Sequence, residues 1–349
     1  MTQTSAEPSG TPEPDAASGP AGTGRQSTPL RSVGEAFLRW REASIIAVAV
    51  VLVVYFQATT GIFLTEDNLV NVSQYVAATA IIAVGQVLLL VSGEIDLSVG
   101  HVYTLAPFLM HYAVDFYSIP VIPAIILALL LSGCVGLVNG LITVKLRVPS
   151  FVTTLGMLFI ISGITLTTSH AYPVPIPEAA TGVQPWLGAA GWSEITWAVL
   201  IVAFFHVVLT RTRWGLHTVA VGGNLLGARE AGIKVGRVKI DNFMICSTLG
   251  GFAGIIEAFR IDSIDPTAGG ETIMFAAVAA AVIGGTALAG GSGTIIGALL
   301  GAIVLGVLRD GFNLIGIDAY TFDLIIGAAI LIAMISNVYL AGLRRAGRT

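Results

Sequence analysis

The stretch that decides the fold is VIPAIILALLLSGCVGLVNGLIT, residues 121–143, which contains no charged side chain. A helix that crosses the hydrocarbon core of a bilayer needs about 20 mostly apolar residues, and this run is long enough. The whole chain is 55% hydrophobic and only 11% charged, whereas an ordinary soluble domain carries about 25% charged residues. The sequence therefore predicts an all-α integral membrane protein.

Similar apolar runs on both sides of this stretch predict about ten transmembrane helices. The third is the weakest because it contains His101, Pro107 and His111. The eighth and ninth are separated only by residues 290–293, so they are either two spans or one re-entrant hairpin. The expected spans are residues 44–60, 70–92, 98–115, 121–143, 150–168, 194–210, 241–260, 271–289, 292–309 and 322–340.

Composition divides the chain into three regions. Residues 1–42 are rich in Pro, Ser, Thr, Gly and Ala, which predicts a disordered cytoplasmic tail. Residues 43–341 form the transmembrane domain, and its long basic loop at 211–240 is expected in the cytoplasm. Residues 342–349 are a short basic cytoplasmic tail. No apolar core precedes residue 44, so the first span is expected to act as an uncleaved signal anchor.

The basic residues orient the spans. Cytoplasmic loops of membrane proteins carry an excess of Lys and Arg. With ten crossings and a cytoplasmic N-terminus, all but two of the 17 Lys and Arg residues fall on the cytoplasmic side, the exceptions being Arg260 and Arg309. Both termini are therefore expected in the cytoplasm. The external loop at 171–193 is either a docking surface or a connector whose tryptophans lie in the membrane interface.

Residues 92–100, SGEIDLSVG, place two carboxylates between apolar stretches. A charge at the centre of a bilayer costs about 2.5–3.5 kcal/mol, so such residues pair, cap a helix or line a wet cavity. One interpretation is a cytoplasmic turn in which Asp96 or Ser98 caps the next helix. The other is a discontinuous helix beside a solute path. Glu94, Asp96 and Ser98, together with Asn139 in a neighbouring span, are the candidate path or gating residues.

Residues 222–233, GGNLLGAREAGI, form the centre of the basic loop. They predict a short helix on the membrane surface with Gly223 and Gly232 at its ends. Such a helix would transmit movement from a soluble partner. The alternative is a solvated basic loop that touches lipid headgroups.

Several glycines have the spacing of helix-packing positions. Small residues at intervals of four let the backbones of membrane helices approach closely. Tight packing is expected here, with a moving seam or a dimer contact as the alternative. The candidate packing glycines are Gly284, Gly285, Gly293, Gly297 and Gly301.

Other classes of function lack their motifs. No Gly-x-x-x-x-Gly-Lys-Ser/Thr is present, which excludes a P-loop on this chain. No cluster of His and Cys suggests a metal, and no Gly-x-Ser-x-Gly suggests a hydrolase. We therefore expect no enzymatic activity, no metal, no cofactor and no nucleic-acid partner.

Three motifs resemble those of one family. GEIDLSVG at residues 93–100 resembles the GGIDLSVG signature of ribose-type bacterial ABC importer permeases, which belong to the branched-chain amino acid/ribose permease superfamily. Residues 221–233 are similar to the cytoplasmic coupling segment of that family, and residues 281–294 to its third conserved segment. The resemblance covers about residues 45–340. It departs from the family at Glu94, where glycine is usual, and at Gly227, where alanine is common.

The resemblance implies a permease domain at 43–341 in the bacterial inner membrane. The imported compound would be a monosaccharide, an autoinducer-2-like compound or a related small polyol. The implied partners are the lipid bilayer, a second permease copy in a homo- or heterodimer, a cytoplasmic ABC ATPase and an extracytoplasmic solute-binding protein. The ATPase is expected to contact the coupling segment at Gly223, Asn224, Ala228, Arg229, Gly232 and Ile233.

Two points stay open. An ion-coupled secondary transporter is the alternative, and it would use Glu94, Asp96 or Glu257 inside the membrane. Hydrogen-bonding groups for a substrate are also present within the spans, and no pattern ranks one above another. They are His101, Tyr103, Asn139 and Asn242.

Overall fold

The computed structural model describes residues 41–318 and, beyond them, isolated positions up to residue 335. The expected tails and the expected last span at 322–340 lie almost entirely outside the described residues. The helices are α2 (Arg41–Thr60), α3 (Glu66–Val91), α4 (Val99–Asp115), α5 (Val121–Lys145), α6 (Ser150–Ser169), α7 (Ser193–Arg211), α8 (Arg213–Gly223), α9 (Leu225–Glu230), α10 (Val235–Ile261), α11 (Gly270–Ile283) and α12 (Ile295–Leu314).

Seven of these helices are long and apolar enough to cross a membrane, namely α2, α3, α5, α6, α7, α10 and α12. The prediction of a multi-span helical protein is confirmed. The expectation of ten full spans needs correction, because α4 has 17 residues and α11 has 14, each below the roughly 20 that a crossing needs. The stretch at 271–309 is thus one partial helix followed by one helix of spanning length.

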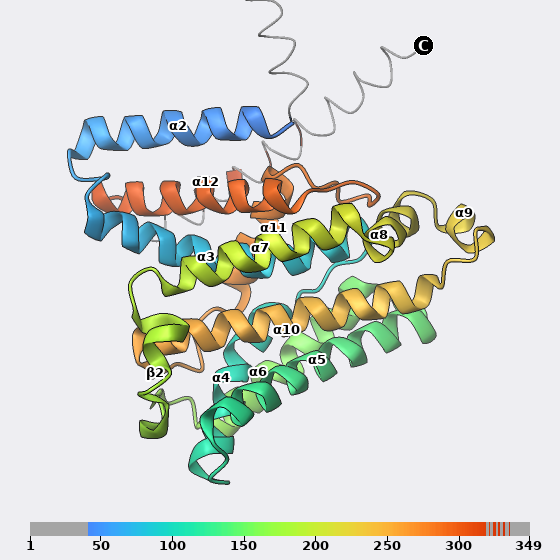
Figure 1. Cartoon of the computed structure of the whole chain (residues 1–349), viewed down its shortest axis with the longest axis horizontal. Helices are drawn as coiled ribbons and strands as arrows, with labels where there is room; N and C mark the ends of the chain where they lie inside the picture. Colours follow the sequence, from blue (N-terminus) through green and yellow to red (C-terminus); the bar gives the residue numbers. More distant parts are fainter. Residues whose placement is uncertain are drawn as a thin grey trace, which may run out of the picture. The chain divides into compact units, whose positions relative to one another are not determined.

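The connection between α6 and α7 contains the remaining elements. A strand β1 (Val174–Pro175) pairs antiparallel with β2 (Ser263–Ile264), which follows α10. Two short helical turns, η1 (Glu178–Ala180) and η2 (Pro185–Ala189), complete the connection. This β1–β2 end lies opposite the end at which α9 is found (Figure 1).

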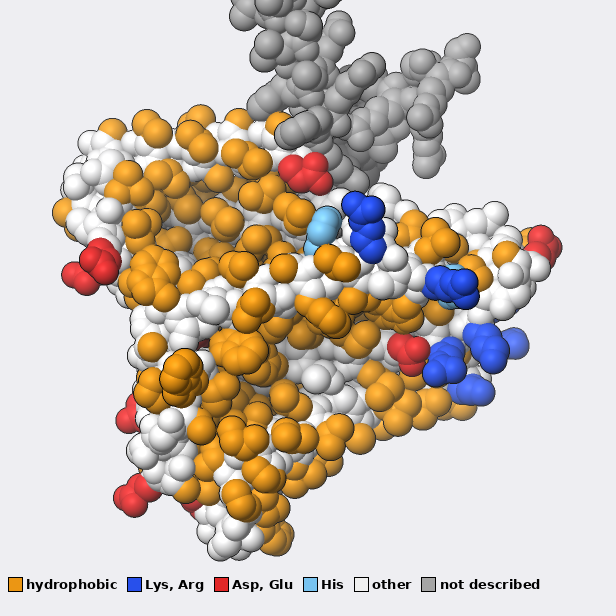
Figure 2. All heavy atoms as spheres, viewed as in Figure 1, with side chains coloured by type: hydrophobic (Ala, Val, Ile, Leu, Met, Phe, Trp, Pro, Cys, Tyr) orange, Lys and Arg blue, Asp and Glu red, His pale blue; other side chains and the backbone are white. Residues whose placement is uncertain are grey.

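Helix α3 forms the centre of the core. Its residues from 76 to 91 are all buried, and it packs against α7, α10, α11 and α12. By contrast, α2, α5, α6 and α7 expose many large apolar side chains. Figure 2 shows this apolar surface along the helices, with the visible Lys and Arg side chains gathered toward the α9 end. The exposed faces are those that lipid would cover.

Both partial helices begin inside the domain. Val99, the first residue of α4, packs against Gly250 near the middle of α10. A Cβ on Gly100 would collide with the carbonyl oxygen of Gly270, so the first turns of α4 and α11 touch each other. From this point α4 runs toward the β1–β2 end and α11 runs toward the α9 end. Gly270 has a φ of 53°, which suits glycine at this abrupt start.

Candidate functional site

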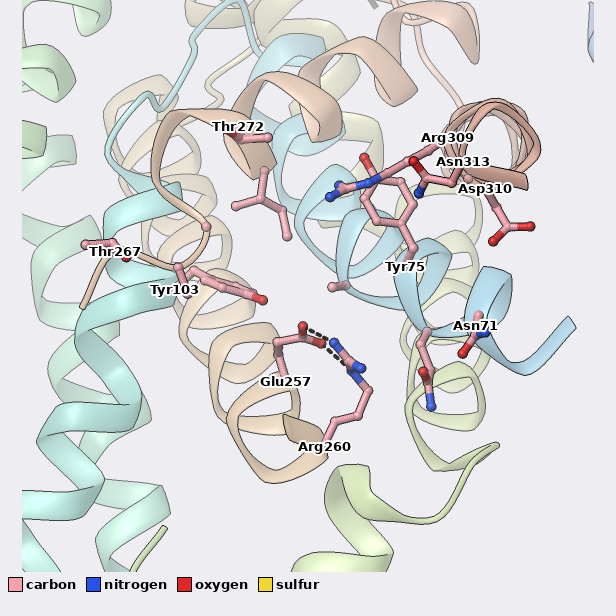
Figure 3. A pocket seen from close by; sticks show the side chains of 16 residues that line it. Asn71, Tyr75, Tyr103, Glu257, Arg260, Thr267, Thr272, Arg309, Asp310 and Asn313 are labelled. Carbon is pink, nitrogen blue, oxygen red and sulfur yellow. Dashed lines mark hydrogen bonds and ion pairs between the residues drawn. The ribbon is translucent and has the colours of Figure 1, made fainter. Parts of the chain in front are cut away.

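A cavity of about 590 Å³ lies between α3, α4, α10, α11 and α12 (Figure 3). It is nearer the β1–β2 end, because α3 contributes its first turns whereas α10 and α12 contribute their last turns. Its walls are mainly polar and aromatic. The polar side chains that line it include Asn71, Gln74, Tyr75, Tyr103, Glu257, Arg260, Thr272, Arg309, Asp310 and Asn313.

Two helix faces supply most of this lining. Residues 71, 74, 75 and 78 follow one face of α3, and residues 306, 309, 310 and 313 follow one face of α12. Side chains three and four residues apart lie on the same side of a helix. Gly306 lets the two helices approach, since a Cβ there would lie 2.5 Å from a methyl group of Val76.

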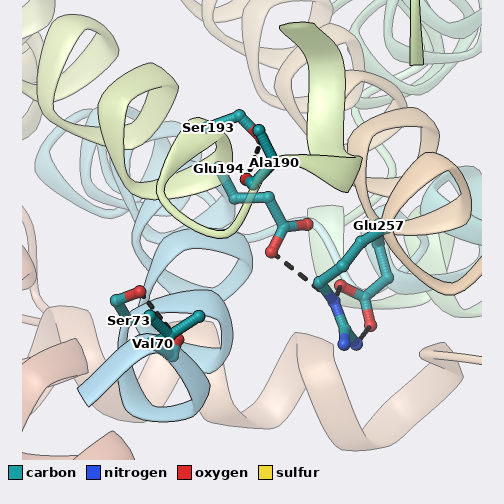
Figure 4. A network of polar contacts seen from close by, with 7 residues as sticks. Val70, Ser73, Ala190, Ser193, Glu194 and Glu257 are labelled. Carbon is teal, nitrogen blue, oxygen red and sulfur yellow. Dashed lines mark hydrogen bonds and ion pairs between the residues drawn. The ribbon is translucent and has the colours of Figure 1, made fainter. Parts of the chain in front are cut away.

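The cations of the cavity are held by neighbouring groups. Arg260 Nε donates to Glu257 Oε2 at 2.9 Å, and a second contact joins its Nη2 to the other carboxylate oxygen. Arg260 Nε also lies 3.5 Å from Oε2 of Glu194, a fully buried residue at the start of α7 (Figure 4). Arg309 stacks over the ring of Tyr75, with Cζ 4.3 Å from the ring centroid.

The formal charges of the lining are balanced. Glu257 and Asp310 carry the negative charges, and Arg260 and Arg309 the positive ones. Asp310 Oδ2 accepts a hydrogen bond of 2.7 Å from Asn68 Nδ2. A cavity with paired charges and many neutral donors and acceptors suits an uncharged, hydrogen-bonding ligand.

A buried polar network surrounds the break before α4. Asp96 and Ser98 are fully buried, and Asp96 Oδ1 accepts from the backbone N–H of Ser98 at 2.8 Å and from its hydroxyl at 2.6 Å. Asn139 Nδ2 donates to Ser98 Oγ at 2.9 Å. Two residues that sequence reasoning missed complete the network: Ser247 Oγ donates to Asp96 Oδ2, and Gln86 Nε2 donates to the Asp96 carbonyl.

Three of the four candidate path residues therefore come together, and the fourth lies nearby. Glu94 Oε1 pairs with Lys239 Nζ of α10 at 2.5 Å, and both side chains are mostly buried. None of the four lines the cavity. They hold the connection between α3 and α4 against α5 and α10, which agrees with a discontinuous helix. Their role in a solute path stays a prediction.

The predicted coupling segment contains the short helix α9. Asn224 ends α8 and caps α9, because its Oδ1 accepts from the N–H of Gly227 at 2.9 Å. Ala228 is buried, whereas Gly223, Asn224, Arg229 and Gly232 are exposed. A small apolar cluster of Val221, Ala228, Val235 and Val238, with Ile233 packed against it, fixes the segment to the start of α10.

The coupling segment also touches the helices that line the cavity. A Cβ on Gly222 would collide with the carbonyl oxygen of Val91 at the end of α3. The same carbonyl accepts a hydrogen bond of 2.8 Å from the N–H of Gly291, in the connection between α11 and α12. Three segments therefore meet at backbone distance, which leaves no space for α8 to move toward the other two without displacing them.

Comparisons with known proteins agree with these features. A family model described as branched-chain amino acid transport system / permease component matches residues 68–334. That match covers most of the chain. The chain belongs to this permease family. No solved structure matches it.

Curated relatives of the permease cover nearly its whole length. It is 36% identical to the xylose/arabinose import permease protein XylH of Sulfolobus acidocaldarius, over 85% of each chain. It is 35% identical to the ribose import permease protein RbsC of Escherichia coli, over 84% of this chain and 92% of that one. It is 31% identical to the L-arabinose ABC transporter permease protein AraH of Azospirillum brasilense, over 96% of each. The family resemblance of the three sequence motifs is confirmed, and the protein is a multi-pass permease of an ABC import system.

The predicted packing glycines lie at close contacts inside the permease. Gly284 and Gly297 face each other where α11 ends and α12 begins, and a Cβ on either would collide with the backbone of the other. Gly301 faces the carbonyl oxygen of Ala280 in the same way. Gly293 approaches Val91 and Thr286. Gly285 instead has a φ of 86°, which is the conformation of a turn.

Sequence reasoning missed most of the cavity, although it named Tyr103 among the possible substrate groups and Glu257 as a possible ion-coupling residue. One signal was available. Arg260 and Arg309 were the only cations left outside the cytoplasmic set, and both line the cavity. A cation that breaks the positive-inside rule needs a partner or a wet environment. Arg260 and Arg309 each have both a partner and the polar cavity around them.

Proposed function

We propose that the protein is the membrane-spanning subunit of an ABC importer for a monosaccharide or a related small polyol, and that the cavity is part of its transport pathway. The observation that carries this proposal is the charge-balanced, hydrogen-bonding cavity between α3 and α12. Its volume lies within the roughly 300–1,000 Å³ of small-molecule sites. The relatives named for ribose, xylose and arabinose support the same class of compound.

The proposed orientation places the α9 end in the cytoplasm of a bacterium and the β1–β2 end outside its plasma membrane. This puts the basic residues of α8 to α10 on the cytoplasmic side, as the positive-inside rule expects. Both termini would then be cytoplasmic. The cavity would receive its ligand from an extracytoplasmic binding protein, and a second permease copy would complete the membrane assembly.

A separate ATPase would bind the exposed part of the coupling segment, around Gly223, Asn224, Arg229 and Gly232. Leu226, which is 66% exposed, offers it an apolar contact. A movement of α8 would reach α3 and the connection before α12 through Gly222. These are the helices whose far ends form the cavity walls, so the same movement would open or close the cavity. Ala228 and Ile233 would keep α9 attached to α10 during this movement.

The test is reconstitution in liposomes with a cognate ATPase and binding protein. We expect ATP-driven uptake of at least one labelled aldopentose among D-ribose, D-xylose and L-arabinose, and no uptake by the permease alone. Accumulation by the permease alone under a proton or sodium gradient would instead establish the ion-coupled alternative. ATP-driven uptake of a branched-chain amino acid without any monosaccharide would reject the proposed substrate class.

Charge reversal at Arg229→Glu is expected to weaken ATPase binding and to lower ATP-driven uptake by about tenfold or more. Arg229 is exposed at the end of α9. Arginines that become buried when a partner protein binds are frequent binding hot spots. Pull-down of the ATPase and uptake are measured together. Lys145→Glu, an equal charge reversal at the exposed end of α5, is the control and should leave both unchanged. Full uptake by Arg229→Glu would contradict the assigned contact.

A further inference from the structure

The floor of the cavity is the place where α4 and α11 begin. Gly269, Thr272 and Ile273 at the start of α11 line the cavity, and so does Tyr103 one turn into α4. A Cβ on Gly269 would lie 2.5 Å from the Tyr103 ring, so the ring rests directly on the backbone at this position. The first turn of α11 and the Tyr103 side chain therefore form one continuous surface.

The first turn of α11 has free hydrogen-bond donors. The residue before the helix is Gly269, which has no side chain to cap it. Within the described part of the chain, the backbone N–H groups of residues 270–272 have no hydrogen-bond partner. The N-terminus of a helix also carries a partial positive charge. Unpaired donors of this kind favour an oxygen of a ligand or of water.

Tyr103 gives an independent indication of a ligand. The residue is only 5% exposed, yet its side chain points into the cavity (Figure 3). No described residue makes a hydrogen bond to its hydroxyl group. The ring is buried while the hydroxyl opens into the cavity, where a bound hydroxyl compound can hydrogen-bond to it.

We propose that the floor formed by Tyr103 and the N-terminus of α11 is the subsite that anchors the substrate, and that it takes an uncharged polyhydroxy compound. The proposal rests on the proposed import function. The free N–H groups donate to hydroxyl or ring oxygens, and the Tyr103 hydroxyl both donates and accepts. Half-helix N-termini near the membrane midplane hold substrate groups in other transporters by the same physics.

The charges around the floor disfavour an anion. Glu257 and Asp310 balance the two arginines of the cavity. Glu271, in the first turn of α11, is a carboxylate near the positive end of the helix dipole and offsets the attraction of that end for an anionic ligand. The carboxylate of a sugar acid would therefore meet no excess of positive charge in the cavity, whereas the parent sugar needs none.

The test measures binding without the solute-binding protein, so that its affinity does not mask that of the permease. The full-length permease with its ATPase is placed in lipid nanodiscs, and saturation-transfer NMR follows D-ribose and D-ribonate at millimolar concentration. We expect D-ribose to bind and D-ribonate not to compete. Tyr103→Phe, which keeps the ring against Gly269, should weaken D-ribose binding about three- to tenfold, the effect of one hydrogen bond.

Two further variants sharpen the test. Thr272→Val removes a cavity hydroxyl from the first turn of α11 at nearly constant volume, and it should also weaken binding. Tyr103→Phe and Thr272→Val are the two floor variants. If one of them fails to fold, D-ribose binding by the other decides the test. Tyr112→Phe is the matched control, because it deletes the same hydroxyl from the same helix outside the cavity. It should bind D-ribose like the wild type.

The possible results distinguish a wrong subsite from a wrong proposed function. Three results would overturn the subsite. They are unchanged D-ribose binding in the folded floor variants, a loss of D-ribose binding in Tyr112→Phe as large as in the floor variants, or binding of D-ribonate equal to that of D-ribose. ATP-driven monosaccharide uptake by the wild type together with any of these results would reject the subsite alone. Absence of monosaccharide uptake in the complete importer would reject the proposed function itself.

Discussion

Gly222→Ala is expected to lower ATP-driven uptake by about tenfold or more while the permease still inserts into the membrane. The added Cβ would collide with the carbonyl oxygen of Val91 and lie 2.7 Å from the backbone nitrogen of Gly291. Contacts this short cannot persist, so α8 must move away from α3. The hydrogen bond between Gly291 and Val91 lies in the same contact and would be strained or lost.

The residue next to it is the control for Gly222→Ala. A Cβ on Gly223 would have one neighbour within 4 Å, the Cα of Gly291 at 3.8 Å, which is an ordinary van der Waals distance. Gly223 also belongs to the surface proposed for the ATPase, but its added methyl group displaces nothing inside the permease, so Gly223→Ala should keep more of the uptake than Gly222→Ala. Both variants add one methyl group to adjacent residues, so their difference isolates the contact with Val91. Uptake is measured in proteoliposomes together with ATP hydrolysis by the associated ATPase.

ATP hydrolysis distinguishes two ways of losing transport. If the contact at Gly222 transmits movement, Gly222→Ala should keep the ATPase bound and hydrolysing ATP while uptake falls. If the substitution only unfolds the cytoplasmic segment, binding of the ATPase falls with uptake. Equal uptake by Gly222→Ala and the wild type would show that the close contact has no role in coupling.

The positions of the helices could be predicted from the sequence because they depend on local composition. Apolar runs of spanning length identified α2, α3, α5, α6, α7, α10 and α12, and they are the helices with the necessary length and hydropathy. The sequence also predicts the short helix in the basic loop, from Gly223 and Gly232 at its ends, and the structure adds that Asn224 caps it. What hydropathy did not reveal is that α4 and α11 begin inside the domain. An apolar partial helix has the same composition as an apolar span.

The cavity was harder to predict because its walls are far apart in the sequence. Asn71 and Tyr75 on α3 face Arg309 and Asn313 on α12, and no local pattern relates the two helices. Each helix has an apolar face toward the core and a polar face at one end, which also describes an ordinary helix end near the membrane interface. The sequence singles out the motif around Asp96, yet its residues stabilise a helix break rather than line the cavity.

Asp96→Ala is expected to cause the largest loss of stability. The carboxylate accepts hydrogen bonds from the Ser98 N–H, the Ser98 hydroxyl and the Ser247 hydroxyl, and all of these are buried. Leaving a buried donor without an acceptor costs about 1–3 kcal/mol, so three lost bonds predict a free-energy cost on the order of 3 kcal/mol or more. Alanine also leaves a space that the neighbouring side chains cannot fill.

Removal of a buried charge is not by itself the cause of this loss. A buried carboxylate is costly to desolvate, and replacing a whole buried polar group by apolar ones is often neutral or stabilising. Here the donors remain after the substitution, which makes the change unfavourable. Asp96→Asn tests this argument, because its amide oxygen can still accept from Ser98 while the charge is lost. It should be clearly more stable than Asp96→Ala.

Thermal unfolding in detergent, followed by size-exclusion chromatography with fluorescence detection, measures both variants against the wild type. Asp67→Ala, which removes an exposed carboxylate from the first turn of α3, is the control and should unfold at nearly the wild-type temperature. If Asp96→Ala unfolds like the control, the network does not hold the start of α4. If Asp96→Asn unfolds as early as Asp96→Ala, the charge itself matters more than the hydrogen bonds, and the break before α4 depends on electrostatic attraction to the helix N-terminus.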